Sequence, residues 1–156
     1  MYSKLLIITL ILAPALGHAG QGKPRIDLSV ASYAEQKAEV EAALADGATY
    51  AEIDSMKRRE VAGALDRIAA VLEATGDVGG LTAEQKVKVF NDQELINTIL
   101  TRAGEDSRIV CRREIKVGTR FAKETCSSVA ERRRIRETAQ SDLKRANLGN
   151  PLMPRD

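Results

Sequence analysis

The chain has 156 residues, with 24 Lys and Arg against 22 Asp and Glu and a formal net charge of +2. Its length suits one domain, and the lack of Trp, with only 2 Phe and 3 Tyr, requires an aliphatic core. The single histidine, His18, lies in a segment that we expect to be removed. Because the mature protein then contains no histidine, histidine-dependent nucleophilic catalysis and histidine-containing metal sites are excluded.

The amino-terminal segment has the pattern of a secretory signal peptide. Lys4 precedes an apolar run over 5–16, and small residues stand at the −3 and −1 positions of a cut after Ala19. The alternative is an uncleaved anchor helix, but the run is short for a membrane span and Pro14 interrupts it. We therefore expect residues 1–19 to be a signal peptide, and the mature protein to be periplasmic or secreted with no transmembrane segment.

Three helices are predicted after a flexible leader over 20–31. Capping boxes, in which Ser or Thr precedes Glu or Gln by three residues, begin at Ser32, Thr49 and Thr82. Apolar residues recur at helical spacing after each box, and the second and third helices should pack antiparallel because their linker is short. The first helix is expected to run to about Ala45, with Gly47 just past its end, and the next two helices to end at Gly76 and Gly104. The expected apolar face of the third helix is Val87, Phe90, Leu95, Ile96, Ile99, Leu100 and Ala103.

The two cysteines enclose a segment that predicts a disulfide-closed β-hairpin. Gly118-Thr119 lies midway and suits a two-residue turn, because Gly accepts a positive φ. Folding about this turn pairs Val117 with Arg120 and places Cys111 opposite Cys126, within the span of a disulfide. A longer turn would change the register. Two free buried cysteines are the alternative, which an oxidising compartment disfavours.

The two faces of the predicted hairpin differ in character. The face that carries Ile115 and Val117 is expected to point inward. The opposite face carries Arg112, Glu114, Lys116 and Lys123 and should meet water, although Phe121 also falls on it.

A fourth capping box begins at Ser128 and predicts a last helix that runs to about Asn147. Its apolar stripe is thin. The predicted fold class is α+β and predominantly α-helical, with helices packed as antiparallel hairpins, one disulfide-linked β-hairpin and a C-terminal helix. Residues 32–148 should form a single globular domain, followed by a tail over 149–156.

Charge is divided unevenly along the chain. Residues 26–107 carry 8 Lys and Arg against 16 Asp and Glu, whereas residues 108–147 carry 12 against 5. The basic half either folds against the acidic helices or binds an anionic partner. The candidate contact residues are Arg112, Arg113, Lys116, Arg120, Arg132, Arg133, Arg134 and Arg136.

A second polar cluster lies on the third predicted helix. It consists of Asn91, Asp92, Gln93, Glu94 and Asn97. A solvated helix face is the simplest interpretation, and a small binding patch or a carboxylate pair is the alternative.

The hairpin resembles one from an uncharacterised family of small exported proteins of Gram-negative bacteria. The similarity rests on Cys111-Arg112-Arg113-Glu114, Gly118-Thr119-Arg120 and Cys126, within residues 108–137. It implies an exported protein with a closed hairpin that leads into a charged helix, and it implies no particular activity.

We expect a monomeric or dimeric, non-catalytic protein of the periplasm or cell envelope. It would bind an anionic or protein partner through the basic hairpin and last helix, without a cofactor or metal. Nucleic acid is disfavoured because aromatic stacking surface is scarce. The alternatives are a structural or inhibitory envelope protein and a carboxylate-dependent enzyme acting on envelope glycans, which needs two acidic side chains about 5–9.5 Å apart.

Overall fold

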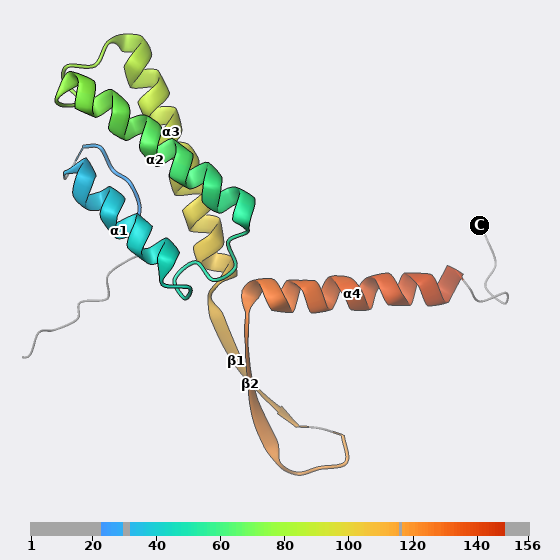
Figure 1. Ribbon diagram of the computed structural model, residues 1–156. Helices are drawn as coiled ribbons and strands as arrows, with labels where there is room; N and C mark the ends of the chain where they lie inside the picture. The colour runs from blue at the N-terminus through green and yellow to red at the C-terminus, as the bar shows by residue number, and fades with distance from the viewer. Residues whose placement is uncertain (1–22, 30–31, 116, 149–156) are drawn as a thin grey trace, which may run out of the picture.

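A computed structural model describes residues 23–29, 32–115 and 117–148 of the chain, so the predicted signal peptide and tail lie outside the described residues. The fold is α+β and mainly helical, as predicted. Figure 1 shows two parts: a core of three helices, and an arm made of a β-hairpin and the last helix. The core contains α1 (Tyr33–Ala45), α2 (Ser55–Thr75) and α3 (Ala83–Asp106), and the arm contains β1 (Ile109–Ile115), β2 (Ala122–Ser128) and α4 (Val129–Leu148).

The helix boundaries follow local capping chemistry in most places. The capping box at Thr82 is present, with its hydroxyl accepting from the Gln85 N–H and the Gln85 side chain accepting in return. The box predicted at Thr49 is wrong, because α2 begins at Ser55, where the Asp54 carboxylate accepts from the Lys57 N–H. At the start of α1, Ser32 makes no side-chain capping bond.

The core is aliphatic and lies between α1, α2 and α3, with α2 and α3 side by side and antiparallel (Figure 1). The buried positions of α2 are Val61, Ala64, Leu65 and Ile68, and those of α3 include Val89, Ile96, Ile99 and Leu100. The predicted apolar face of α3 is wrong in its first turns, since Val87 and Phe90 are exposed while Val89 is buried. The predicted end of α3 at Gly104 is also wrong, because the helix continues to Asp106.

Residues 23–29 are held against α3, contrary to the flexible leader expected there. The Ile26 side chain is buried, and its backbone N–H and C=O bond the Asn97 amide at 2.8 and 2.7 Å. The Leu28 N–H donates to the Gln93 side chain at 3.0 Å. Two members of the polar cluster on α3 therefore bind this segment, and a third, Asp92, pairs with Arg67 of α2 at 2.5 Å.

The hairpin has the predicted register and the predicted disulfide. Cys111 lies opposite Cys126 and the two sulfurs are bonded at 2.04 Å. The two-residue turn is wrong, since the strands end at Ile115 and Ala122 and Gly118 takes a φ of 87° in the longer connection. The predicted register is still correct, because the two strands end the same number of residues earlier than predicted, at Ile115 and Ala122.

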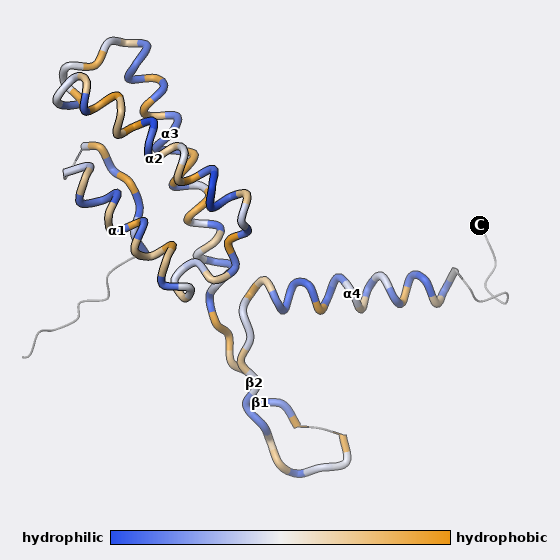
Figure 2. Tube along the Cα trace, in the orientation of Figure 1, coloured by the Kyte–Doolittle hydropathy of each residue, from blue (hydrophilic) through white to orange (hydrophobic). Residues whose placement is uncertain are grey.

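The arm extends away from the core. Val117 is 105% exposed and Ile115 66% exposed, so the prediction that this face points inward is wrong. Of the hairpin residues described, only Ser128 at the base is buried. Figure 2 shows that hydrophilic residues dominate α4, and its apolar residues Ile135 and Leu143 are exposed as well. Among the described residues, no helix has the length and apolar character needed to cross a membrane.

The first prediction concerns the contact between Asn97 and Ile26. Asn97→Ala leaves the N–H and C=O of Ile26 without their partner, and each lost bond to a half-buried group costs about 1–3 kcal/mol. We expect the free energy of unfolding, measured by urea denaturation, to fall by roughly 2–4 kcal/mol. Asn91→Ala, at an exposed position of the same helix, is the control and should change it by less than about 0.5 kcal/mol. Equal effects would contradict the assigned contact.

The second prediction concerns the disulfide. Replacing Cys111 and Cys126 together by Ser removes a cross-link whose 15-residue loop is worth about 3 kcal/mol in the chain-entropy model. Because the hairpin hardly contacts the core, this loss should be confined to the arm. Hydrogen exchange should accelerate by roughly 100-fold in β1 and β2. The slow amides of α2 and α3 should not change, and their acceleration would show that the hairpin stabilises the core.

Candidate functional site

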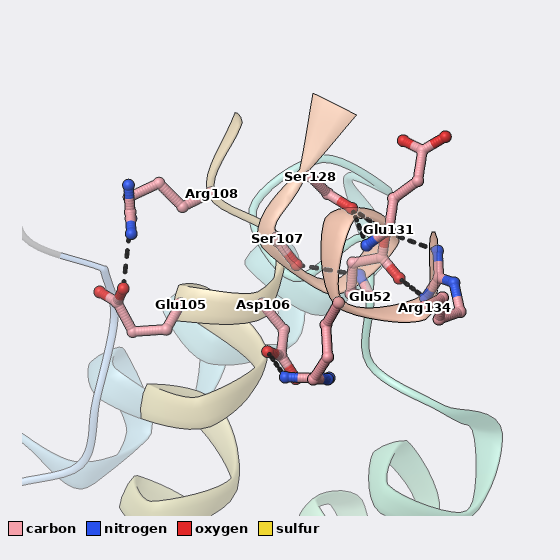
Figure 3. Close-up of polar contacts among 9 residues, drawn as sticks. Glu52, Glu105, Asp106, Ser107, Arg108, Ser128, Glu131 and Arg134 are labelled. Carbon is pink, nitrogen blue, oxygen red and sulfur yellow. Dashed lines mark hydrogen bonds and ion pairs between the residues drawn. The ribbon is translucent and has the colours of Figure 1, made fainter. Parts of the chain in front are cut away.

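The arm joins the core through Glu52, which lies in the loop between α1 and α2. The Glu52 N–H donates to the Ser107 Oγ at 2.9 Å, just after α3. Its carboxylate accepts from the Ser128 Oγ at 2.5 Å and from Arg134 of α4 at 2.8 Å (Figure 3). The Ser128 Oγ also accepts from the Glu131 N–H, which caps α4 as predicted. One side chain thus connects the core, the base of the hairpin and the first turns of α4.

A second ion pair supports this junction. Arg133 of α4 donates to both carboxylate oxygens of Asp106, at 2.7 and 3.0 Å. The hydrogen bond from Arg133 lowers the pKa of Asp106, and the bond from Arg134 lowers the pKa of Glu52. Two of the candidate binding arginines, Arg133 and Arg134, are therefore engaged by the acidic core. The positive charges of these two residues are therefore neutralised by carboxylates of the same chain.

The junction also contains a group of carboxylates in a hollow. Glu52, Asp54 and Asp106 line a cavity of about 450 Å³ together with Arg133. A glycan-cleaving mechanism needs one carboxylic acid that stays protonated at its working pH because its pKa is raised. The pKa values of Glu52 and Asp106 are both lowered. This geometry fits an anchor for the arm better than an acid–base pair.

The remaining candidate residues lie along the arm. Arg112, Arg113, Arg120 and Arg136 are exposed, and none of them has an ion pair with another described residue. Arg113 stands opposite Glu124 in the ladder, but the two side chains form no ion pair. Lys116 lies outside the described residues.

Three of these basic residues meet in the angle between the hairpin and α4, which we call the inner notch. This hollow has a volume of about 480 Å³. Its charged lining is Arg112, Arg132, Arg136 and Glu114, and its polar lining includes Thr125 and Ser127. The Arg132 Nε is buried and has no hydrogen-bond partner among the described residues. Arg113 is excluded from the notch because successive residues of a strand point to opposite faces.

Sequence reasoning missed the role of Glu52, which it assigned to a capping box. The signal in the sequence was Asp54, a good N-cap residue that competes with Thr49 for the start of this helix and leaves Glu52 in the loop. It also missed the inner notch, although Arg132 and Arg136 are four residues apart and so share a face of α4.

Among the described residues, one group of three side chains able to bind a metal lies together: Cys111, Glu124 and Cys126. Its two sulfurs are already joined in the disulfide, so neither is a thiolate ligand.

Comparison with known proteins adds no relative. The chain matches no protein-family model, no curated protein and no solved structure. The structure shows the disulfide-closed hairpin on which the resemblance rests, and no family match supports the family itself.

The third prediction is a pH dependence of the junction. A carboxyl group whose pKa is lowered in the folded state contributes stability above its ordinary pKa, and loses it as the pH falls through the folded value. The ordinary values are 4.5 for Glu52 and 3.8 for Asp106. We expect the NMR amide shifts of residues 128–134 to move toward those of a detached helix as the pH falls from about 5 to about 3.

The variant that tests this prediction is Glu52→Gln with Asp106→Asn. Its junction amides should have detached-like shifts already at neutral pH and should respond little to acid. Glu73→Gln, at an exposed position of α2, is the control and should behave like the unmodified protein. An equal response to acid in the double variant and in the unmodified protein would contradict the role of these ion pairs.

Proposed function

We propose that this chain is an exported, non-catalytic protein that binds an anionic component of the periplasm or cell envelope through its basic arm. The observation that carries the proposal is the set of exposed arginines without ion-pair partners on a structure that projects from an acidic core. The disulfide suits an oxidising compartment, and the pattern of residues 1–19 supports export. The hairpin also resembles that of small exported proteins of Gram-negative bacteria, and we include membership of that family in the proposal.

The shape of the arm limits how much of its positive charge the acidic residues of the three-helix core can neutralise. α4 has 20 residues, and a helix of this length extends about 30 Å. Charges in salt at physiological strength are screened beyond about 8 Å. Arg133 and Arg134, at the base of the arm, contact core carboxylates, and Arg108 just before β1 pairs with Glu105 of α3. Arg145 pairs with Asp142 within α4. The others remain available to phosphate or carboxylate groups of a partner.

A second candidate function is the recruitment of another envelope protein. Ile135 and Leu143 are 60% and 65% exposed on α4, and Phe121 is 87% exposed near the hairpin tip. Exposed apolar residues beside cations favour a protein surface that is both acidic and apolar. Salt dependence separates the two candidates, because apolar contacts strengthen with salt whereas charge pairing weakens.

The fourth prediction tests the basic arm directly. The mature protein should bind vesicles containing phosphatidylglycerol, or polyglutamate, in low salt and lose binding in about 0.5 M salt. Replacing Arg112, Arg113, Arg120 and Arg136 by Gln should weaken binding to anionic vesicles at least about 100-fold, since each basic residue near such a surface contributes about 1 kcal/mol. Sedimentation with the vesicles measures both effects.

The matched control removes the same charge from the core. It replaces Arg25, Arg59, Lys86 and Lys88, all exposed, by Gln. This variant should keep most of the binding, and circular dichroism should show the same helix content in both variants. Equal losses would mean that net charge alone drives the binding, and failure of the unmodified protein to bind either probe in low salt would reject the proposed function.

A further inference from the structure

The inner notch gathers like charges without neutralising them. Its charged lining has three arginines and one glutamate, and that glutamate, Glu114, stands directly across the ladder from Lys123. None of the three arginines has an ion pair among the described residues. Arg133 and Arg134, which lie between Arg132 and Arg136 in the sequence, both have one. A hollow with one dominant sign of charge and low-dielectric walls concentrates the electric field and attracts a counter-ion.

Unused hydrogen-bond donors line the same hollow. Arg132 lines the hollow from α4, and its Nε is enclosed by protein without a hydrogen-bond partner among the described residues. The hydroxyls of Thr125 and Ser127 lie on the hairpin side of the notch and make no hydrogen bond to other described residues. Side chains that carry donor groups therefore line one volume from three elements: Arg112 from β1, Thr125 and Ser127 from β2, and Arg132 and Arg136 from α4.

The number of these donors selects the chemistry of the ligand. Each guanidinium offers a planar fork of N–H groups that fits two oxygens of an anion. A carboxylate has two oxygens and would leave part of such a set unused. A phosphate group has up to four oxygens around one centre and accepts from several sides.

We propose that the inner notch is a phosphate-binding site in which Arg112, Arg132 and Arg136 hold a phosphate monoester or diester. This inference deepens the proposed function and rests on it, because it names the chemical group that the basic arm binds. The site takes its geometry from the angle between the hairpin and α4, which the Glu52 junction fixes. Arg112 and Arg113 are neighbours in sequence, yet only Arg112 serves the site.

That sidedness provides the fifth prediction. Inorganic phosphate is titrated into the mature protein while the Nε–Hε signals of its arginines are followed by NMR. Saturable shifts are expected for Arg112, Arg132 and Arg136. Arg112→Gln should weaken the binding by at least about 10-fold, the usual effect of losing a hydrogen bond to a charged group. Arg113→Gln removes the same charge from the opposite face and should change it by less than about 2-fold.

Several results would overturn the site. One is a set of unsaturable shifts spread over all arginines, including Arg113 and Arg145. Another is an equal loss of phosphate affinity in Arg112→Gln and Arg113→Gln. If these two variants also lose vesicle binding equally while the unmodified protein binds vesicles, the proposed function stands and the discrete site is rejected. If the unmodified protein binds phosphate in the notch but neither vesicles nor polyglutamate, the site stands and the proposed partner class is rejected.

A competition experiment identifies the source of the phosphate group. Inorganic phosphate is added to protein bound on phosphatidylglycerol vesicles, with chloride at equal ionic strength as reference. Release beyond that caused by chloride assigns the notch to lipid headgroups. Release equal to that caused by chloride, with phosphate still saturating the notch, assigns it to a soluble phosphorylated ligand.

Discussion

The side chain of Glu52 sets the position of the arm. Its carboxylate accepts hydrogen bonds from Ser128 and Arg134, and its backbone N–H donates to Ser107. A loop of the core therefore binds the chain both just before β1 and where β2 passes into α4. The side chains of Glu52 and Asp106 are 20% and 16% exposed, whereas those of their partners Arg134 and Arg133 are 59% and 41% exposed. The two ion pairs, together with the hydrogen bonds of Ser107 and Ser128, hold α4 in one orientation against the core. The angle that forms the inner notch depends on these contacts.

This arrangement divides the arginines of α4 by face. Arg133 and Arg134 hold the helix to the core, whereas Arg132 and Arg136 turn toward the hairpin. Consecutive basic residues on a helix point in different directions, so one short run provides both the anchor and the binding surface. Substituting the whole run would therefore mix a structural effect with a functional one.

Local chemistry made much of the fold predictable. The register of the hairpin follows from the equal spacing of Cys111 and Cys126 about the pair Gly118-Thr119, and the start of α3 follows from Thr82 and Gln85. Non-local contacts account for the errors. The box at Thr49 failed because Tyr50 enters the core and Glu52 binds residues 55 and 76 positions away. The segment around Ile26 is composed like a flexible leader, but Asn97 fixes it from 71 positions away. The inner notch could not be predicted because it depends on the angle between α4 and the hairpin, which is set by contacts between distant segments.

The sheet of the arm has only two strands, so each strand has one side without a neighbour. Such free backbone edges are templates on which another chain can add a strand and begin aggregation. Charged residues stand along both edges: Arg112, Arg113 and Glu114 on β1, and Lys123 and Glu124 on β2. Charged side chains on an edge strand oppose the addition of another strand. The charged residues of the hairpin therefore disfavour strand pairing between two copies at these edges, and a polyanion that neutralised the basic ones would weaken that effect.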